Sequence, residues 1–170
     1  GTCCGGYHIT HMAVINCHFI HNANMKYPTE TEGKGAGIRV YWASNWLVDN
    51  SKFLSNVANQ EGGAIWMWEC KMKGFIKNSY FVRNKAIVKG EGAGIYVFRI
   101  KFIVIQKTTF MLNSDSMKGG GIFLFDILNK AILKNCLLTS NRAEKGGGLF
   151  VQLATEIVLI KVYFNLNNAE

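Results

Sequence analysis

The chain has 170 residues, of which 49% are hydrophobic and 12% aromatic, and this composition suits one domain with a sizeable buried core. A charged fraction of 18% is too low for an intrinsically disordered chain, and no apolar run is long enough for a transmembrane helix. The formal net charge of +8 comes from scattered basic residues, so we expect no dedicated nucleic-acid-binding face.

The first 35 residues hold four histidines, His8, His11, His18 and His21, around Cys17. A metal site would need several converging rings with fixed partners, and we interpret these rings instead as exposed polar side chains. The cysteines are odd in number and show no Cys-x-x-Cys spacing, so we expect no metal, no cofactor and no disulfide framework. They are Cys3, Cys4, Cys17, Cys70 and Cys136. The segment between Asn22 and Gly35, which contains Pro28, is expected to form an exposed loop.

From Gly35 onward the sequence repeats a glycine-rich signature. The apolar residue that closes each copy recurs at spacings of about 27 to 30 residues, a period typical of repeat folds. A second signature, Phe-x-x-Asn, alternates with the first. The glycine copies close at Ile38, Ile65, Ile95, Ile122 and Leu149, and the second signature begins at Phe19, Phe53, Phe81, Phe110, Leu138 and Phe164.

Alternating Gly-Gly-Ala-[Ile/Leu/Val] and Phe-x-x-Asn repeats resemble the arrays of the chlamydial polymorphic membrane proteins. The resemblance covers about residues 16–169 and implies a right-handed parallel β-helix that serves as a surface stalk or passenger, often in adhesion. The sequence departs from the family at Leu138, which replaces the repeat phenylalanine. The motifs are specific for architecture and say little about activity.

The period alone leads to the same all-β fold. A coil of three short strands and three turns needs about 27 residues and cannot bury its own apolar face, so neighbouring coils must stack. We therefore predict a right-handed parallel β-helix of about six coils over residues 1–170. We also expect this segment to be a slice of a longer solenoid, because both ends fall within a repeat.

Period-two alternation assigns the residues that point inward. It predicts apolar columns after the glycines and before each Phe-x-x-Asn, and a stacked column of phenylalanines. It also predicts a structural ladder of amides, because asparagine both donates and accepts hydrogen bonds. The ladder consists of Asn22, Asn56, Asn84, Asn113, Asn141 and Asn167, and a second, broken column contains Asn16, Asn50, Asn78 and Asn135.

Glu69, Arg99 and Asp126 occupy the third inward position of three successive coils. Two carboxylates at this spacing could serve a glycan hydrolase or lyase. The alternative, which we favour, is an ion-pair ladder in which the arginine neutralises both acids. We therefore predict no catalytic residue.

The residues expected to point outward after the glycines are aromatic instead of polar. Eight aromatics on one sheet would exceed the apolar patch found on ordinary monomers, so we predict that they form an interaction face. They are Tyr41, Trp66, Trp68, Tyr96, Phe98, Phe123, Phe125 and Phe150. The outward row before Phe-x-x-Asn is likewise apolar, with Leu47, Phe75, Val104, Ile132 and Val158.

Two classes of function fit this face. A structural or adhesive protein of a cell surface or extracellular assembly would pack the aromatics against a second copy or a neighbouring chain. A polysaccharide-binding or polysaccharide-cleaving protein would stack them on sugar rings. Glycan sites usually add polar neighbours for the hydroxyl groups, and this face has only Arg39 and Gln152 at its ends, so we favour protein packing.

Overall fold

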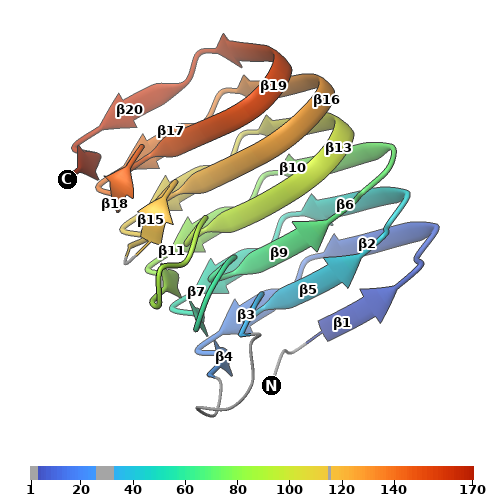
Figure 1. Cartoon of the computed structure of the whole chain (residues 1–170), viewed down its shortest axis with the longest axis horizontal. Coiled ribbons are helices and arrows are strands. Elements are labelled where there is room, and N and C mark those ends of the chain that lie inside the picture. The colour runs from blue at the N-terminus through green and yellow to red at the C-terminus, as the bar shows by residue number, and fades with distance from the viewer. Residues whose placement is uncertain (1–3, 26–32, 115) are drawn as a thin grey trace.

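The computed structural model describes residues 4–25, 33–114 and 116–170, and all regular structure in these ranges is β-strand (Figure 1). Every strand pairing is parallel, and the chain winds through about five full turns, so that six copies of the main columns lie on top of one another. The predicted parallel β-helix is confirmed. Residues 26–32 of the predicted loop, and Cys3, lie outside the described residues.

The first and second sides of the solenoid belong to one nine-stranded sheet, whose three long strands bend around the corner between the two sides (Figure 1). The first side contains β1 (Cys4–Tyr7), β5 (Ile38–Tyr41), β9 (Ile65–Trp68) and the first halves of β13 (Ile95–Gln106), β16 (Ile122–Lys134) and β19 (Leu149–Ile160). The second side contains β2 (His11–Ile15), β6 (Asn45–Asp49), β10 (Lys73–Lys77) and the second halves of the same long strands.

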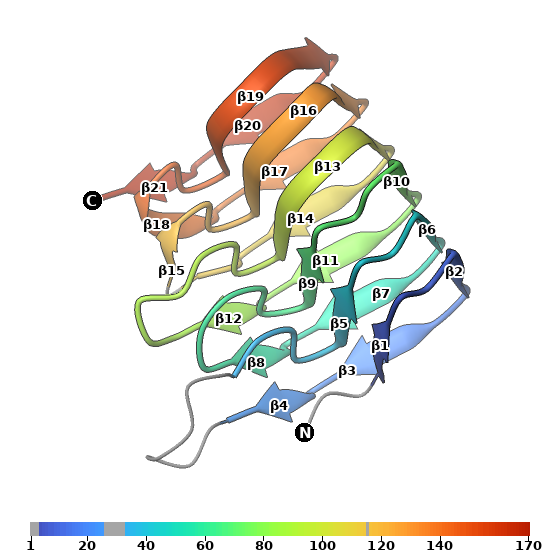
Figure 2. The ribbon, with the colours of Figure 1, turned by 45° about the vertical axis from the view of Figure 1, so that its right-hand side comes forward.

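The third side is a separate six-stranded sheet, and the chain returns to the first side through two small three-stranded sheets (Figure 2). The third side contains β3 (His18–Ile20), β7 (Lys52–Leu54), β11 (Tyr80–Val82), β14 (Thr109–Met111), β17 (Leu137–Thr139) and β20 (Tyr163–Asn165). The small sheets are β4 (Ala23–Asn24), β8 (Val57–Ala58) and β12 (Lys85–Ala86), then β15 (Ser116–Lys118), β18 (Arg142–Lys145) and β21 (Asn168–Ala169).

Each corner is turned by one residue in the left-handed region. Between the second and third sides this residue is mostly asparagine, as at Asn50 (φ 44°) and Asn78 (φ 50°), because its short amide tolerates this conformation. On the return to the first side it is always glycine, as at Gly62 (φ 65°), where an added β-carbon would collide with the carbonyl oxygen of Ile65.

The core lies inside the coils and follows the predicted alternation. The rings of Phe19, Phe53, Phe81 and Phe110 form a continuous stack, with successive centroids 4.7 Å apart. Leu138 continues the column fully buried, while Phe164 in the last coil is 48% exposed. The predicted phenylalanine column is therefore confirmed, including its leucine substitution.

Trp46 on β6 is a core residue that the repeat analysis did not single out. It is 2% exposed and pairs in register with Gly74 on β10, where an added β-carbon would collide with the indole ring. The glycine thus provides the space that this large ring occupies between two coils. The described part of the chain contains no α-helix long and apolar enough to cross a membrane.

Candidate functional site

The predicted amide ladder runs through all six coils. In each step the backbone N–H and the side-chain Nδ2 of one asparagine both donate to Oδ1 of the next, as from Asn56 to Asn84 at 3.0 and 2.9 Å. Nδ2 of Asn84 also donates to the carbonyl of Phe53 at 3.0 Å. Because the four central members are fully buried, these bonds satisfy groups that water cannot reach. The ladder is therefore structural, as predicted.

The second asparagine column lies at the corner between the second and third sides and is less regular. Asn50 donates to Asn16, whereas Asn78 donates to Oδ1 of Asp49 at 2.9 Å. This bond, and then Lys77 at 3.2 Å, lower the pKa of Asp49 below its ordinary value. The unbroken column is thus the better satisfied of the two, as the sequence predicted.

The three charged residues proposed from the sequence do come together. Nη1 of Arg99 lies 3.1 Å from Oε1 of Glu69, and its Nε lies 2.8 Å from Oδ2 of Asp126. Trp42 extends this ladder by donating its indole N–H to Glu69 at 2.9 Å, and the ring of His8 stacks on Trp42. Hydrogen bonding to Asp126 raises the pKa of Arg99 further above its ordinary value.

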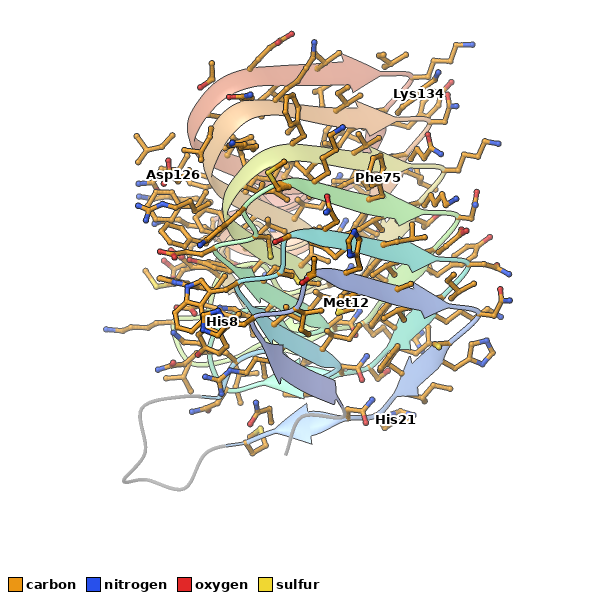
Figure 3. The ribbon with its side chains drawn as sticks, turned by 90° about the vertical axis from the view of Figure 1, so that its right-hand side faces the viewer. His8, Met12, His21, Phe75, Asp126 and Lys134 are labelled. Atoms are coloured by element: carbon orange, nitrogen blue, oxygen red, sulfur yellow. The ribbon has the colours of Figure 1, made fainter. Side chains whose placement is uncertain are left out.

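These side chains point outward, which corrects the inward position expected from the alternation. Glu69, Arg99 and Asp126 all have φ between 53° and 58°. In this left-handed conformation each side chain turns out of the coil. Asp126 and His8 accordingly lie along one outer edge of the molecule (Figure 3). Arg99 forms an ion pair with each of the two carboxylates, so the arrangement is the ion-pair ladder that we favoured.

The eight predicted face aromatics form one cluster on the outside of the first side, separate from the main core; we call it the aromatic cluster. Its rings contact one another along and across the coils, with centroids 4.1 Å apart for Trp68 and Phe98 and 5.3 Å apart for Tyr96 and Phe123. Exposure falls to 1% at Trp66 and 0% at Phe123. The expected exposed patch is therefore absent at its centre, where the chain itself covers the rings.

The cover comes from the residue that precedes each glycine turn. Lys34 and Glu61 pair at 3.1 Å, and Nζ of Lys34 lies 5.2 Å from the ring centroid of Trp66. Glu61 also accepts the indole N–H of Trp66 at 3.0 Å. Lys118 and Glu91 repeat the arrangement two coils further on, at 2.8 Å.

This cover was readable in the sequence as a charged residue directly before each glycine, a signal that the repeat analysis missed. The column comprises Lys34, Glu61, Glu91, Lys118 and Lys145. Tyr96 lies close to it: burial raises the pKa of Tyr96 above its ordinary value, and the charges of Glu61 and Glu91 raise it further. Four members of the cluster, Tyr41, Trp68, Phe125 and Phe150, remain half-buried along its margin.

The second side carries an outward apolar row in which Phe75 is exposed and the other members are half-buried. The row runs across the coils and includes Phe75, which is 41% exposed, and Phe102 next to this row is 37% exposed. On β10 and β16 a lysine lies two residues to either side of this row, while the neighbouring strands carry Asp49, Phe102, Gln106 and Glu156 at these positions. We call this surface the lysine-flanked face; its row is Leu47, Phe75, Val104, Ile132 and Val158, and its lysines are Lys73, Lys130, Lys77 and Lys134.

Two surface hollows lie beside described strands of the second side and of the small sheet that contains β18. One, of about 340 Å³, opens on the lysine-flanked face between Ala13, Leu47 and Phe75, where the small alanine leaves space. The other, of about 550 Å³, lies beside β18 under the turn that contains Ile87 and Lys89. Only the first hollow adjoins the outward apolar row.

The histidines of the first coil do not assemble a metal site within the described residues, where no group of three His, Cys, Asp or Glu side chains could hold an ion. His18 is exposed, as expected. Cys17, Cys70 and Cys136 are free thiols, and burial raises the pKa of Cys70 to about 12.

The model of the right-handed β-helix region matches residues 3–169, so the chain belongs to this family. The match covers almost the whole chain and gives the hand of the solenoid described above. No curated protein and no solved structure matches the chain.

Proposed function

We propose that this β-helix is a non-enzymatic structural or adhesive protein that works by packing its outer faces against other protein. The observation that carries the proposal is the outward apolar row of the lysine-flanked face, where Phe75 is 41% exposed and the neighbouring Phe102 is 37% exposed. Contiguous exposed apolar surface on a folded chain marks sites of contact with other macromolecules.

A place on a cell surface or in an extracellular assembly is the second part of the proposal. Its support is the resemblance of the glycine and Phe-x-x-Asn repeats to the chlamydial polymorphic membrane proteins. A rigid solenoid that projects its sides into solution suits such a role, because every coil adds another row to the same faces.

The aromatic cluster contributes to this role in two ways. Its buried centre, around Trp66 and Phe123, forms a second core that stiffens the rod from outside. Its half-buried margin, at Tyr41, Trp68 and Phe125, is the part available to a partner. Contact through this margin stays a prediction, and the lysine-flanked face is the stronger candidate because Phe75 and Phe102 are more exposed than any ring of the cluster.

A polysaccharide-binding or polysaccharide-cleaving protein is the alternative. It is favoured by the family, which includes polysaccharide-active members, and by the two carboxylates of Glu69 and Asp126 on one edge. Against cleavage, Arg99 lies between the two carboxylates and forms an ion pair with each, so neither is free to contact a substrate.

The proposal is tested by placing a photo-crosslinking amino acid at Phe75 in the protein within its native source. We expect a crosslinked product that contains a second polypeptide. Tyr80 on β11 is the matched control, since it is 49% exposed but lies on the third side. Equal crosslinking from both positions, or none from Phe75, would contradict protein packing through this face.

The alternative has its own test. Purified wild-type protein and a Glu69→Gln/Asp126→Asn variant would be incubated with acidic and neutral polysaccharides, and new reducing ends and unsaturated products would be measured. We expect neither protein to cleave any of them. Cleavage by the wild type that the variant loses, with an unchanged melting temperature, would establish the enzyme instead.

A further inference from the structure

The lysine-flanked face combines three features that together specify a partner: an apolar centre, positive edges and a hollow. The inference rests on the proposed function, because it names the partner of that same face. We propose that this face seats an amphipathic α-helix of another protein, whose apolar stripe lies along the row of Phe75 and whose acidic residues meet the lysines on both edges.

The charges of the lysine-flanked face indicate the charge of its partner. Lys77 pairs with Asp49 at 3.2 Å and Lys130 with Glu156 at 2.8 Å, so the acids of this sheet are already engaged. Among the described residues no acid forms an ion pair with Lys73 or Lys134, which lie on opposite edges of the row. Figure 3 looks onto this side and labels Phe75 and Lys134. A second copy, itself carrying +8, would bring lysine against lysine.

The dimensions of the face match one helix. With Ala13, which pairs with Leu47, the row crosses six coils, and five spacings of about 4.8 Å make it about 24 Å long. A helix rising about 1.5 Å per residue covers that length with about 16 residues. The two lysine edges are four residues apart along a strand, or about 13 Å, close to the 10–12 Å diameter of a helix with its side chains.

The backbone of the face excludes a partner that adds a strand. Strands β6, β10 and β13 are paired on both edges, so their backbone hydrogen bonds are used between the coils. Only side chains point out of the sheet, and a helix binds through side chains alone. The hollow beside Leu47 and Phe75 then accepts one large apolar side chain of the helix as an anchor.

The experiment uses a labelled synthetic helix of about 18 residues with a leucine stripe and glutamates on both flanks, and measures fluorescence anisotropy against the purified chain. A second peptide keeps the stripe and replaces every flanking glutamate with lysine. We expect the acidic peptide to bind, at least tenfold more tightly than the basic one, a difference of about 1.4 kcal/mol.

Two variants locate the binding. Phe75→Ser removes the centre of the row, and Lys73→Glu/Lys134→Glu reverses both unpaired edges. We expect the first to weaken binding about tenfold or more, and the second to reverse the preference so that the basic peptide binds better. Tyr80→Ser is the control for the first variant, and unchanged melting temperatures show that each variant is folded.

Vesicles of anionic and of neutral phospholipid form the last arm, because an apolar and basic face could also lie on a lipid surface. Binding to anionic vesicles without binding to the acidic peptide would overturn the helix proposal in favour of a membrane. Peptide binding that survives both Phe75→Ser and the charge reversal would also overturn it. A crosslink from Phe75 to a native polypeptide that is not displaced by the acidic peptide would leave the proposed function standing while this inference fails.

Discussion

Asn56 donates both its backbone N–H and its side-chain Nδ2 to the single Oδ1 atom of Asn84, at 3.0 and 2.9 Å. Both residues are fully buried, and the same pair of bonds recurs between every two coils. One side-chain oxygen therefore satisfies two buried donors of the coil before it, and this couples each coil to the next.

Replacing Asn84 with Ala should consequently lower the free energy of unfolding by about 2–4 kcal/mol, because two buried donors of Asn56 lose their acceptor. Urea denaturation followed by circular dichroism measures this loss. Asn78→Gly is the control: it removes an exposed amide and keeps the left-handed corner accessible, so we expect a loss below about 1 kcal/mol. If both variants lost a similar free energy of unfolding, the buried ladder would not be the main source of this stability.

Replacing Trp66 with Ser should destabilise the isolated chain by about 3–5 kcal/mol, the usual cost of removing a large buried ring. The reason is that Trp66 is 1% exposed and bonded to Glu61 without any partner protein. Trp68→Ser, at the half-buried margin of the aromatic cluster, should cost less. The melting temperatures of the two variants test this order. If Trp66→Ser melted like the wild type, the aromatic cluster would not be a second core.

Stability should fall in alkaline solution. The pKa of Cys70 is raised to about 12 by burial, so the unfolded thiol ionises near pH 9 while the folded one stays protonated. The contribution of the Cys70 thiol to the free energy of unfolding is fully present below pH 9. It is lost as the pH rises towards 12, with a slope of up to about 1.4 kcal/mol per pH unit. Burial raises the pKa of Tyr96 as well, so its contribution is lost in the same direction, above pH 10.

Urea denaturation at several pH values between 8 and 11 measures this slope. Cys70→Ala should flatten it from pH 9 upward, and Tyr96→Phe should flatten it above pH 10, because each variant removes one group that ionises only in the unfolded chain. A slope that neither substitution changes would show that other groups control the alkaline transition.

The repeat period accounts for most of what the sequence predicted correctly. It places Phe53 over Phe19 and Asn84 over Asn56, because residues one period apart must stack in a parallel solenoid. The inward alternation held along straight strands and failed at Glu69, because a left-handed corner residue interrupts the period of two. The same position is left-handed in every coil, at His8, Trp42, Glu69, Arg99, Asp126 and Leu153, but alternation alone does not mark it.

The exposure of the aromatic cluster was the larger error. Alternation correctly put Trp66 on the outer surface of the strand, but it carries no information about a neighbouring turn that folds back over that surface. The pairing of Trp46 with Gly74 was missed for a related reason: each residue departs from the repeat in one coil, and only their register in space connects them. A repeat period predicts the contacts that every coil makes, but not a contact that occurs in one coil only.

The most direct test of protein packing through the lysine-flanked face is hydroxyl-radical footprinting of the chain, alone and within its native assembly. We expect Phe75 and Phe102 to react readily in the isolated chain and to become protected in the assembly, because protein covers the lysine-flanked face there. Tyr80 on the third side should react equally in both states. Phe75 and Phe102 that stay as reactive in the assembly as in the isolated chain would contradict protein packing through this face.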